Sequence, residues 1–136
     1  MERKANVQSF IKKWDGVRLH DAGSYVSDEF RTFQRAFFAA MRKIAKSVGG
    51  EVVNPSYGHY DMSGFVKRGD KFVYFNYSNI DRTMVRLTEQ PSYRCVMYVR
   101  TAEDEKDYRG GRNHNVSFEN CEWVISKLLD EEHKRV

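Results

Sequence analysis

The spacing of hydrophobic residues changes along the chain and predicts helices towards both ends with strands between them. Apolar residues recur every three or four positions from about Arg3 to Trp14, over 28–48, and from about Phe118 to Glu132. This is the period of a helix with one buried face. The middle helix has the clearest limits, because Ser27 can cap its start, Asp28 and Glu29 lie in its first turn, and Gly49-Gly50 follows it.

Between the second and third helical segments the hydrophobic period shortens to two, which indicates β-strands. Two strands, His59–Lys67 and Lys71–Ser78, flank a connector centred on Gly69, and this arrangement is typical of a hairpin. Both alternating sets of Lys71–Ser78 are rich in large side chains, so we expect both faces of this strand to be covered. A further strand is predicted over Ser92–Arg100.

Two shorter segments are harder to assign from the pattern. Glu51–Val53 has the composition of a strand, and we expect Pro55 to close it, because proline has no backbone N–H to donate. Met84–Leu87 is mostly apolar, but it is too short for its pattern to distinguish a strand from a loop. The predicted order is therefore α-α-β-β-(β)-β-α.

This order predicts an α+β fold, in which a small antiparallel sheet of three or four strands carries helices on one face. With 136 residues, of which 40% are hydrophobic, the chain is expected to form one domain over 1–136. Residues 1–50 would be its helical part, and 51–136 would contain the sheet and the last helix.

The cysteines and the N-terminus predict a cytoplasmic protein. Cys95 and Cys121 are isolated in apolar surroundings, which is typical of buried thiols in a reducing compartment. The first ten residues, MERKANVQSF, lack the apolar stretch of a signal peptide. No stretch approaches the roughly 18 apolar residues of a membrane span, so no membrane contact is predicted.

The net charge of +4 is unevenly distributed. Met1–Arg68 holds 12 Lys and Arg against 7 Asp and Glu, whereas Gly69–Val136 holds 11 against 12. Helical spacing places four basic residues of the second helix on one exposed stripe, and none has an acidic residue four positions away. This stripe is the best electrostatic candidate for binding an anionic partner: Arg31, Arg35, Arg42 and Lys46.

The stretch VRTAEDEKDYRGGRNHNVSF, Val99–Phe118, mixes basic and acidic residues around two glycines. It matches neither GxxxxGK[ST] nor GxGxxG, so it does not predict a phosphate-binding loop. We interpret it as a polar loop that joins a core strand to a helix capped by Ser117. Binding residues are often found on such loops, and four are candidates here: Tyr108, Arg109, Arg112 and His114.

The residues favour a protein without catalytic residues, cofactor or metal. His59 and Asp61 would share a strand face and offer two ligands, but nothing in the sequence marks a third. A hydrolase or nuclease that uses these two residues with His114 remains an alternative that rests on residue types alone. Both cysteines are better explained as core residues than as nucleophiles.

Two segments, YGHYDMSGFVKRGDKFVYFNYS and RTAEDEKDYRGGRNHNVSFEN, carry a resemblance to a known group of proteins. The second resembles a segment of small proteins from Firmicutes phages and integrated mobile elements. The first is similar in layout to the strand region of small type II-A anti-CRISPR proteins, which inhibit Cas9. The resemblance covers roughly Tyr57–Asn120 and matches no functional residue.

The resemblance implies a phage or mobile-element interaction protein without catalytic activity. Such a protein would inhibit a host defence nuclease by occupying a functional surface. The resemblance favours a Cas9-type CRISPR effector as this nuclease. Its partner would then be a protein target such as the Cas9–guide RNA complex. The alternative is a nucleic-acid-binding accessory protein, whose basic helix stripe contacts the phosphate backbone.

Overall fold

The structure is a computed structural model, and it describes residues 5–19, 28–58, 61–78, 84–89 and 96–131. These residues contain helices and an antiparallel sheet, so the predicted α+β class is confirmed, with five strands instead of three or four. The elements are α1 (Gln8–Trp14), α2 (Asp28–Ser47), β1 (Glu51–Tyr57), β2 (Asp61–Arg68), β3 (Lys71–Ser78), β4 (Val96–Ala102), β5 (His114–Asn115) and α3 (Phe118–Asp130).

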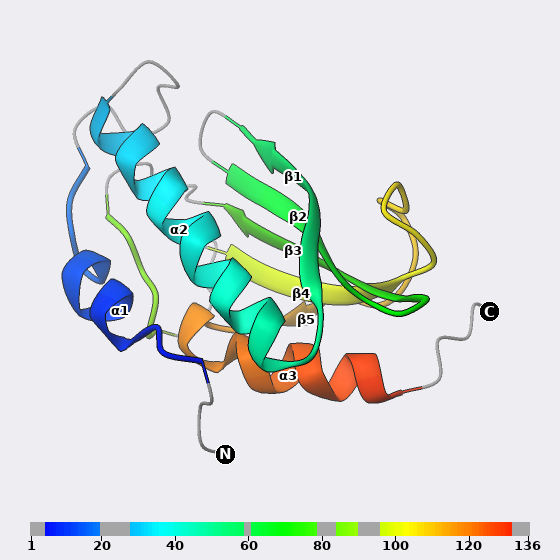
Figure 1. Cartoon of the computed structure of the whole chain (residues 1–136). Coiled ribbons are helices and arrows are strands. Elements are labelled where there is room, and N and C mark those ends of the chain that lie inside the picture. The colour runs from blue at the N-terminus through cyan, green and yellow to red at the C-terminus, as the bar shows by residue number, and fades with distance from the viewer. Residues whose placement is uncertain (1–4, 20–27, 59–60, 79–83, 90–95, 132–136) are drawn as a thin grey trace.

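The five strands form one sheet in the order β1-β2-β3-β4-β5, and every neighbouring pair is antiparallel. Each strand therefore pairs with the strand that follows it in the chain. The helices lie on one side of this sheet, and the loop between β4 and β5 lies on the other side (Figure 1). The predicted placement of the helices on one face is confirmed.

The hairpin of β2 and β3 has the predicted turn at Gly69, and its register pairs Phe65 with Tyr74 and Val66 with Val73. As expected, β3 is covered on both faces. Phe75 and its alternate neighbours belong to the large core beneath the helices, whereas Tyr74 belongs to a second, smaller cluster with Phe65 and Ala102.

Strand β1 does not end before Pro55 as predicted, but continues to Tyr57. Its pairing with β2 shifts between Val53 and Ser56, and Asn54 between them has a φ of 51°. This is the geometry of a bulge. Because β1 is an edge strand, the missing N–H of Pro55 removes no bond to a further strand, and the proline is tolerated there.

The other element limits differ in smaller ways. Helix α1 begins at Gln8 instead of near Arg3, and β4 continues two residues beyond Arg100. The last two residues before Val116 form β5, inside the stretch predicted to be a loop. Met84 belongs to no strand of the sheet, but forms an isolated bridge with Arg18. The predicted Ser27 cap, His59, residues 92–95 and Glu132 lie outside the described residues.

The core is centred on the ring of Phe37, which is fully buried in α2. Its centroid lies 5.3 Å from that of Tyr77 on β3 and 5.8 Å from that of Phe118 at the start of α3. It also lies 6.5 Å from the ring of Phe10 on α1. This side chain of α2 thus contacts the sheet and both other helices.

Two carboxylates connect segments that are distant in sequence. The Oδ1 atom of Asp15, after α1, accepts hydrogen bonds from the backbone N–H groups of Leu87 at 2.6 Å and Thr88 at 3.2 Å. Glu122 on α3 is buried, and its Oε2 accepts from the N–H of Ala5 at 2.7 Å and from the hydroxyl of Ser47. The first pair of bonds joins the end of α1 to the segment 84–89, and the second joins α3 to the chain before α1 and to the end of α2. No helix among the described residues is long and apolar enough to cross a membrane.

Replacing Phe37 with alanine is predicted to lower the free energy of unfolding by about 3–5 kcal/mol, because the cavity would open at the junction of every layer. Urea denaturation followed by circular dichroism measures this loss. Phe72→Ala is the control, since Phe72 is only partly buried on the other face of the sheet. If both variants lose the same stability, Phe37 is not the centre of the core.

Candidate functional site

The basic row of α2, defined as Arg31, Arg35, Arg42 and Lys46, is exposed along its whole length. The opposite side of the helix buries Phe33, Phe37 and other apolar side chains, so its packing on the sheet turns the row outwards. Arg42 and Lys46 form no ion pair with any residue that the structure describes. The row is therefore placed as predicted, on one solvent-facing surface.

A half-exposed aromatic ring borders the row at its N-terminal half. Tyr57, the last residue of β1, is 51% exposed, and its ring centroid lies 4.5 Å from that of Phe38 on α2. A hollow of about 300 Å³ between the two elements is lined by Arg31, Gln34, Arg35, Tyr57 and Gly58. The Nε2 atom of Gln34 donates a hydrogen bond to the carbonyl oxygen of Gly58 at 2.9 Å, which joins the helix to this end of β1.

Tyr57 was not predicted as a surface residue, because the sequence pattern ended β1 at Pro55. Simple alternation would not have signalled its position, because the bulge places Tyr57 opposite Met62 of the large core, whereas Val53 lies opposite Phe65 of the smaller cluster.

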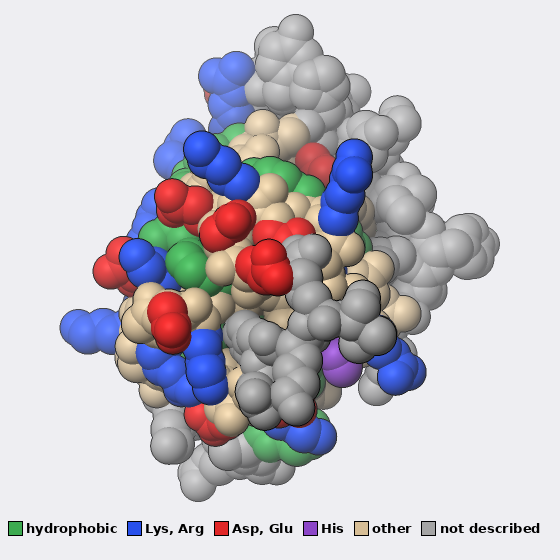
Figure 2. All heavy atoms as spheres, turned by 90° about the vertical axis from the view of Figure 1, so that its right-hand side faces the viewer, with side chains coloured by type: hydrophobic (Ala, Val, Ile, Leu, Met, Phe, Trp, Pro, Cys, Tyr) green, Lys and Arg blue, Asp and Glu red, His purple; other side chains and the backbone are tan. Residues whose placement is uncertain are grey.

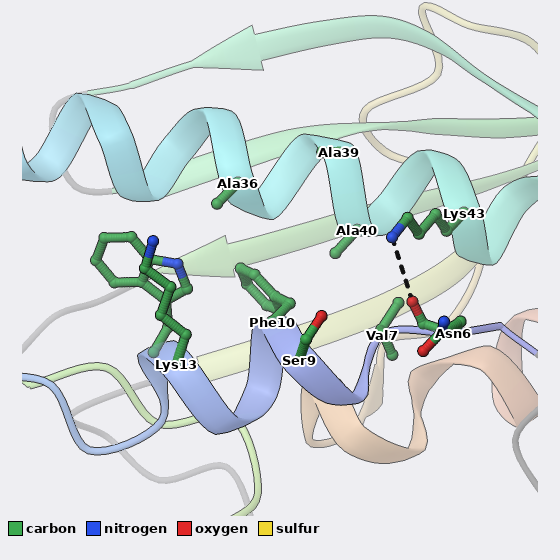
Figure 3. Close-up of a pocket in the computed structure, with 10 residues that line it drawn as sticks. Asn6, Val7, Ser9, Phe10, Lys13, Ala36, Ala39, Ala40 and Lys43 are labelled. Atoms are coloured by element: carbon green, nitrogen blue, oxygen red, sulfur yellow. Dashed lines mark hydrogen bonds between the residues drawn. The ribbon is translucent and has the colours of Figure 1, made fainter.

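A second hollow borders the row on its other side, between α2 and α1 (Figure 3). It has a volume of about 270 Å³. Phe10 of α1 and the alanines of α2, Ala36, Ala39 and Ala40, line its apolar part. The Nζ atom of Lys43 reaches across it to the carbonyl oxygen of Asn6, at 3.4 Å. The row is thus flanked by two depressions with different chemistry.

Three of the four candidates, Tyr108, Arg109 and Arg112, lie in the loop on the other side of the sheet from the basic row, whereas His114 lies in β5 opposite Val99 of the core beneath the helices. Tyr108 is 48% exposed, but its ring packs against those of Phe65, at 5.4 Å, and Tyr74, at 5.7 Å. Its hydroxyl accepts a hydrogen bond from the Nδ2 atom of Asn54, the bulge residue of β1, at 3.0 Å. Tyr108 therefore attaches the loop to the sheet with one side of its ring.

The remaining loop candidates are less constrained. Arg109 and Arg112 are exposed, and His114 is partly buried in β5, where it pairs with Val99. Figure 2 shows acidic side chains gathered near the middle of this side of the molecule, with Lys and Arg side chains around them. The predicted residues therefore form two separate surfaces, one on α2 and one on the loop.

Acidic side chains organise the loop. Asp107 accepts hydrogen bonds from three backbone N–H groups, those of Glu103 at 2.9 Å, Arg109 at 3.2 Å and Gly110 at 2.7 Å. Asp104 accepts from the N–H of Lys106 at 2.8 Å. Such side-chain bonds stabilise turns, so these two carboxylates are already engaged within the loop.

Arg100 lies beneath the loop and holds it from the side of the sheet. Its guanidinium lies 4.6 Å from the ring centroid of Tyr74 and 5.7 Å from that of Tyr98. It donates to Oδ1 of Asn113 at 3.2 Å and to the carbonyl oxygen of Tyr108. Partial burial, and then the neighbouring Tyr74, raise the pKa of Tyr98 above its ordinary value.

Among the residues that the structure describes, no group of three His, Cys, Asp or Glu side chains is placed to hold a metal ion. His59 and Cys95 lie outside the described residues, and Cys121 is buried in α3 as expected for a core residue.

Comparison with known proteins gives no match: no protein-family model, no curated protein and no solved structure resembles the chain significantly.

Gly111 is predicted to be required for the loop. Its φ is +79°, and an added Cβ would collide with the carbonyl oxygen of Thr101. Gly69 also has a positive φ, +63°, but a Cβ there would meet open space. Gly69→Ala should cost about 1–2 kcal/mol of backbone strain. Gly111→Ala should cost more, because Thr101 must also move, and urea denaturation compares the two variants. Equal losses would show that the contact with Thr101 does not constrain the loop.

Proposed function

We propose that this protein is an interaction module of a phage or mobile element, which inhibits a defence nuclease in the host cytoplasm by covering part of its surface. The observation that carries the proposal is the exposed basic row on α2. The resemblance over 57–120 supports a Cas9-type effector with its guide RNA as the partner. The protein would act by binding and not by chemistry.

The basic row suits this role because it is long and rigidly supported. Arg31 and Lys46 are 15 positions apart in one helix of 20 residues, which corresponds to about 22 Å along the axis. The aromatic packing on the other side of α2 fixes the direction in which the row points. Such an array complements an RNA backbone or an acidic protein surface, and it accelerates association with either.

The loop would supply a second contact of different character. Arg109 and Arg112 project near acidic residues of the same loop, so this surface is of mixed sign. Mixed charges fix the orientation and register of a partner more than they add to affinity. Because the loop and the row face opposite directions, a partner has to surround the sheet to contact both. The two surfaces are therefore tested separately.

Changing all four residues of the basic row to alanine is predicted to weaken inhibition of Cas9 cleavage by at least tenfold. About 0.5 kcal/mol for each lost charge contact gives a factor of this size. The assay measures cleavage of a plasmid target by the Cas9–guide RNA complex at increasing concentrations of the inhibitor. Circular dichroism verifies that the variant folds.

The matched control removes four positive charges that lie outside both surfaces: Arg18, Lys67, Lys71 and Lys127. It should inhibit as well as the wild-type protein. A third variant, Arg109→Ala with Arg112→Ala, tests the loop. If wild-type protein leaves cleavage by several Cas9 orthologues unhindered, the proposal is wrong. If only the loop variant loses inhibition, the interface is the loop.

A second candidate function is direct binding of nucleic acid by the same basic row, in an accessory protein that acts without a nuclease. The observation that favours it is the absence of any acidic residue within the row itself, from Arg31 to Lys46. Phosphate contacts by such a row carry no sequence information. Binding would therefore be non-specific and sensitive to salt.

If each of the four side chains neutralises one phosphate of duplex DNA, affinity is predicted to fall by about a hundredfold between roughly 50 and 200 mM salt. Removing Arg31 and Arg35 should halve the slope of log affinity against log salt. Mobility shift or fluorescence anisotropy over a salt series measures both values. An affinity that does not change with salt would exclude contact with the backbone.

A further inference from the structure

We propose that the groove between α1 and α2 binds a peptide segment of a partner protein that carries one large apolar side chain flanked by carboxylates. This inference goes beyond the proposed function, because it concerns a different surface and does not require the partner to be a nuclease.

The shape of the groove favours a single side chain as its occupant. Three alanines of α2 line the hollow, and Ala36 and Ala40 point towards α1 (Figure 3). Longer side chains at these positions would fill the space between the helices. Its volume of about 270 Å³ lies below the roughly 300–1,000 Å³ of typical small-molecule pockets. The ring of Phe10 forms part of the apolar wall. A phenylalanine or leucine side chain would find apolar contacts on both helices.

The charges around the groove favour carboxylates beside that apolar side chain. Lys13 on α1 and Lys43 on α2 are both exposed and lie on opposite sides of the hollow (Figure 3). No acidic side chain lines the groove among the described residues. Arg42 follows on the exposed side of the same helix and extends the positive surface. An acidic segment therefore complements the rim, whereas a basic segment would be repelled.

The walls of the groove are held in place before any partner binds. The ring of Trp14 lies 5.4 Å from that of Phe33, and the ring of Phe10 lies 5.1 Å from that of Phe118. These contacts join α1 to α2 and α3 beneath the groove. A preformed apolar pocket with charged neighbours is typical of the sites that contribute most of the energy in protein interfaces.

The test uses the full chain and a short synthetic peptide with a central phenylalanine flanked on each side by glutamates. Titration followed by NMR of the ¹⁵N-labelled protein is expected to shift the backbone amides of Phe10, Ala36, Ala39 and Ala40. Fluorescence anisotropy of the labelled peptide measures the affinity. A peptide with serine in place of the phenylalanine, and one with lysines in place of the glutamates, should each bind at least about fivefold more weakly.

Two variants of the protein make the test specific. Ala39→Leu would fill the groove from an exposed helical position, and it should weaken binding of the glutamate peptide by about tenfold. Lys13→Glu with Lys43→Glu should lose the glutamate peptide and gain the lysine peptide. Lys127→Glu is the matched control, because Lys127 lies 5.6 Å from the ring of Trp123, as Lys13 does from Trp14. It should bind the glutamate peptide normally.

Several results would overturn the inference. Equal binding of the serine peptide would mean that attraction between charges explains the affinity and the groove is not used. Unchanged binding by Ala39→Leu would mean the same. Self-association that Ala39→Leu abolishes in analytical ultracentrifugation would identify a second copy of this chain as the occupant. The titration contains no nuclease, so a negative result would count against the groove proposal alone. The proposed function would still be tested by the cleavage assay.

Discussion

The packing of Phe37 is the contact on which the rest of the structure depends. This ring touches aromatic residues of α1, β3 and α3, so the three helices and the sheet meet at one side chain. The same contact determines the orientation of the surface. A helix that buries Phe33 and Phe37 has to turn Arg35 and Arg42 towards solvent, because these residues lie on its other side. The basic row is thus a consequence of the core.

The second face of the sheet is covered by a loop and not by a helix. This is sufficient because the apolar cluster there is small, with Phe65, Tyr74 and Ala102 buried. Tyr108 covers their rings, and Arg100 holds the loop from beneath by stacking on Tyr74 and bonding to the backbone of Tyr108. A polar loop can therefore complete a core when a few of its side chains supply the apolar contacts and its carboxylates satisfy its turns.

Local patterns predicted the elements whose limits are set locally. Helix α2 has a strong apolar face and ends at a glycine with a φ of +83°, and both features are readable in the sequence. Strand β1 was missed beyond Pro55, because tolerance of the proline depends on the edge position of the strand. The short strand β5 was also missed, since two polar residues are held in it only by their pairing with β4.

For the candidate site, helical spacing was enough to predict that the basic row of α2 is a single exposed surface. It was not enough to show that Tyr108 and Arg109 lie on the other side of the sheet, since that depends on the whole strand order. The exposure of Tyr57 and the groove beside Ala39 likewise depend on how separate elements pack. Such features arise from contacts between distant segments, which composition and spacing do not record.

The unequal charge of the two halves of the chain becomes an unequal charge of two sides of the molecule. The helices α1 and α2 carry the basic row and the lysines at the groove, whereas acidic side chains gather on the side of the loop (Figure 2). A protein with this distribution is turned in the field of a polyanion before contact, because the basic side is attracted more strongly than the side of mixed charge. The side that arrives first is the one with both the row and the groove. Electrostatic orientation and apolar anchoring would then act in sequence on the same surface of α2.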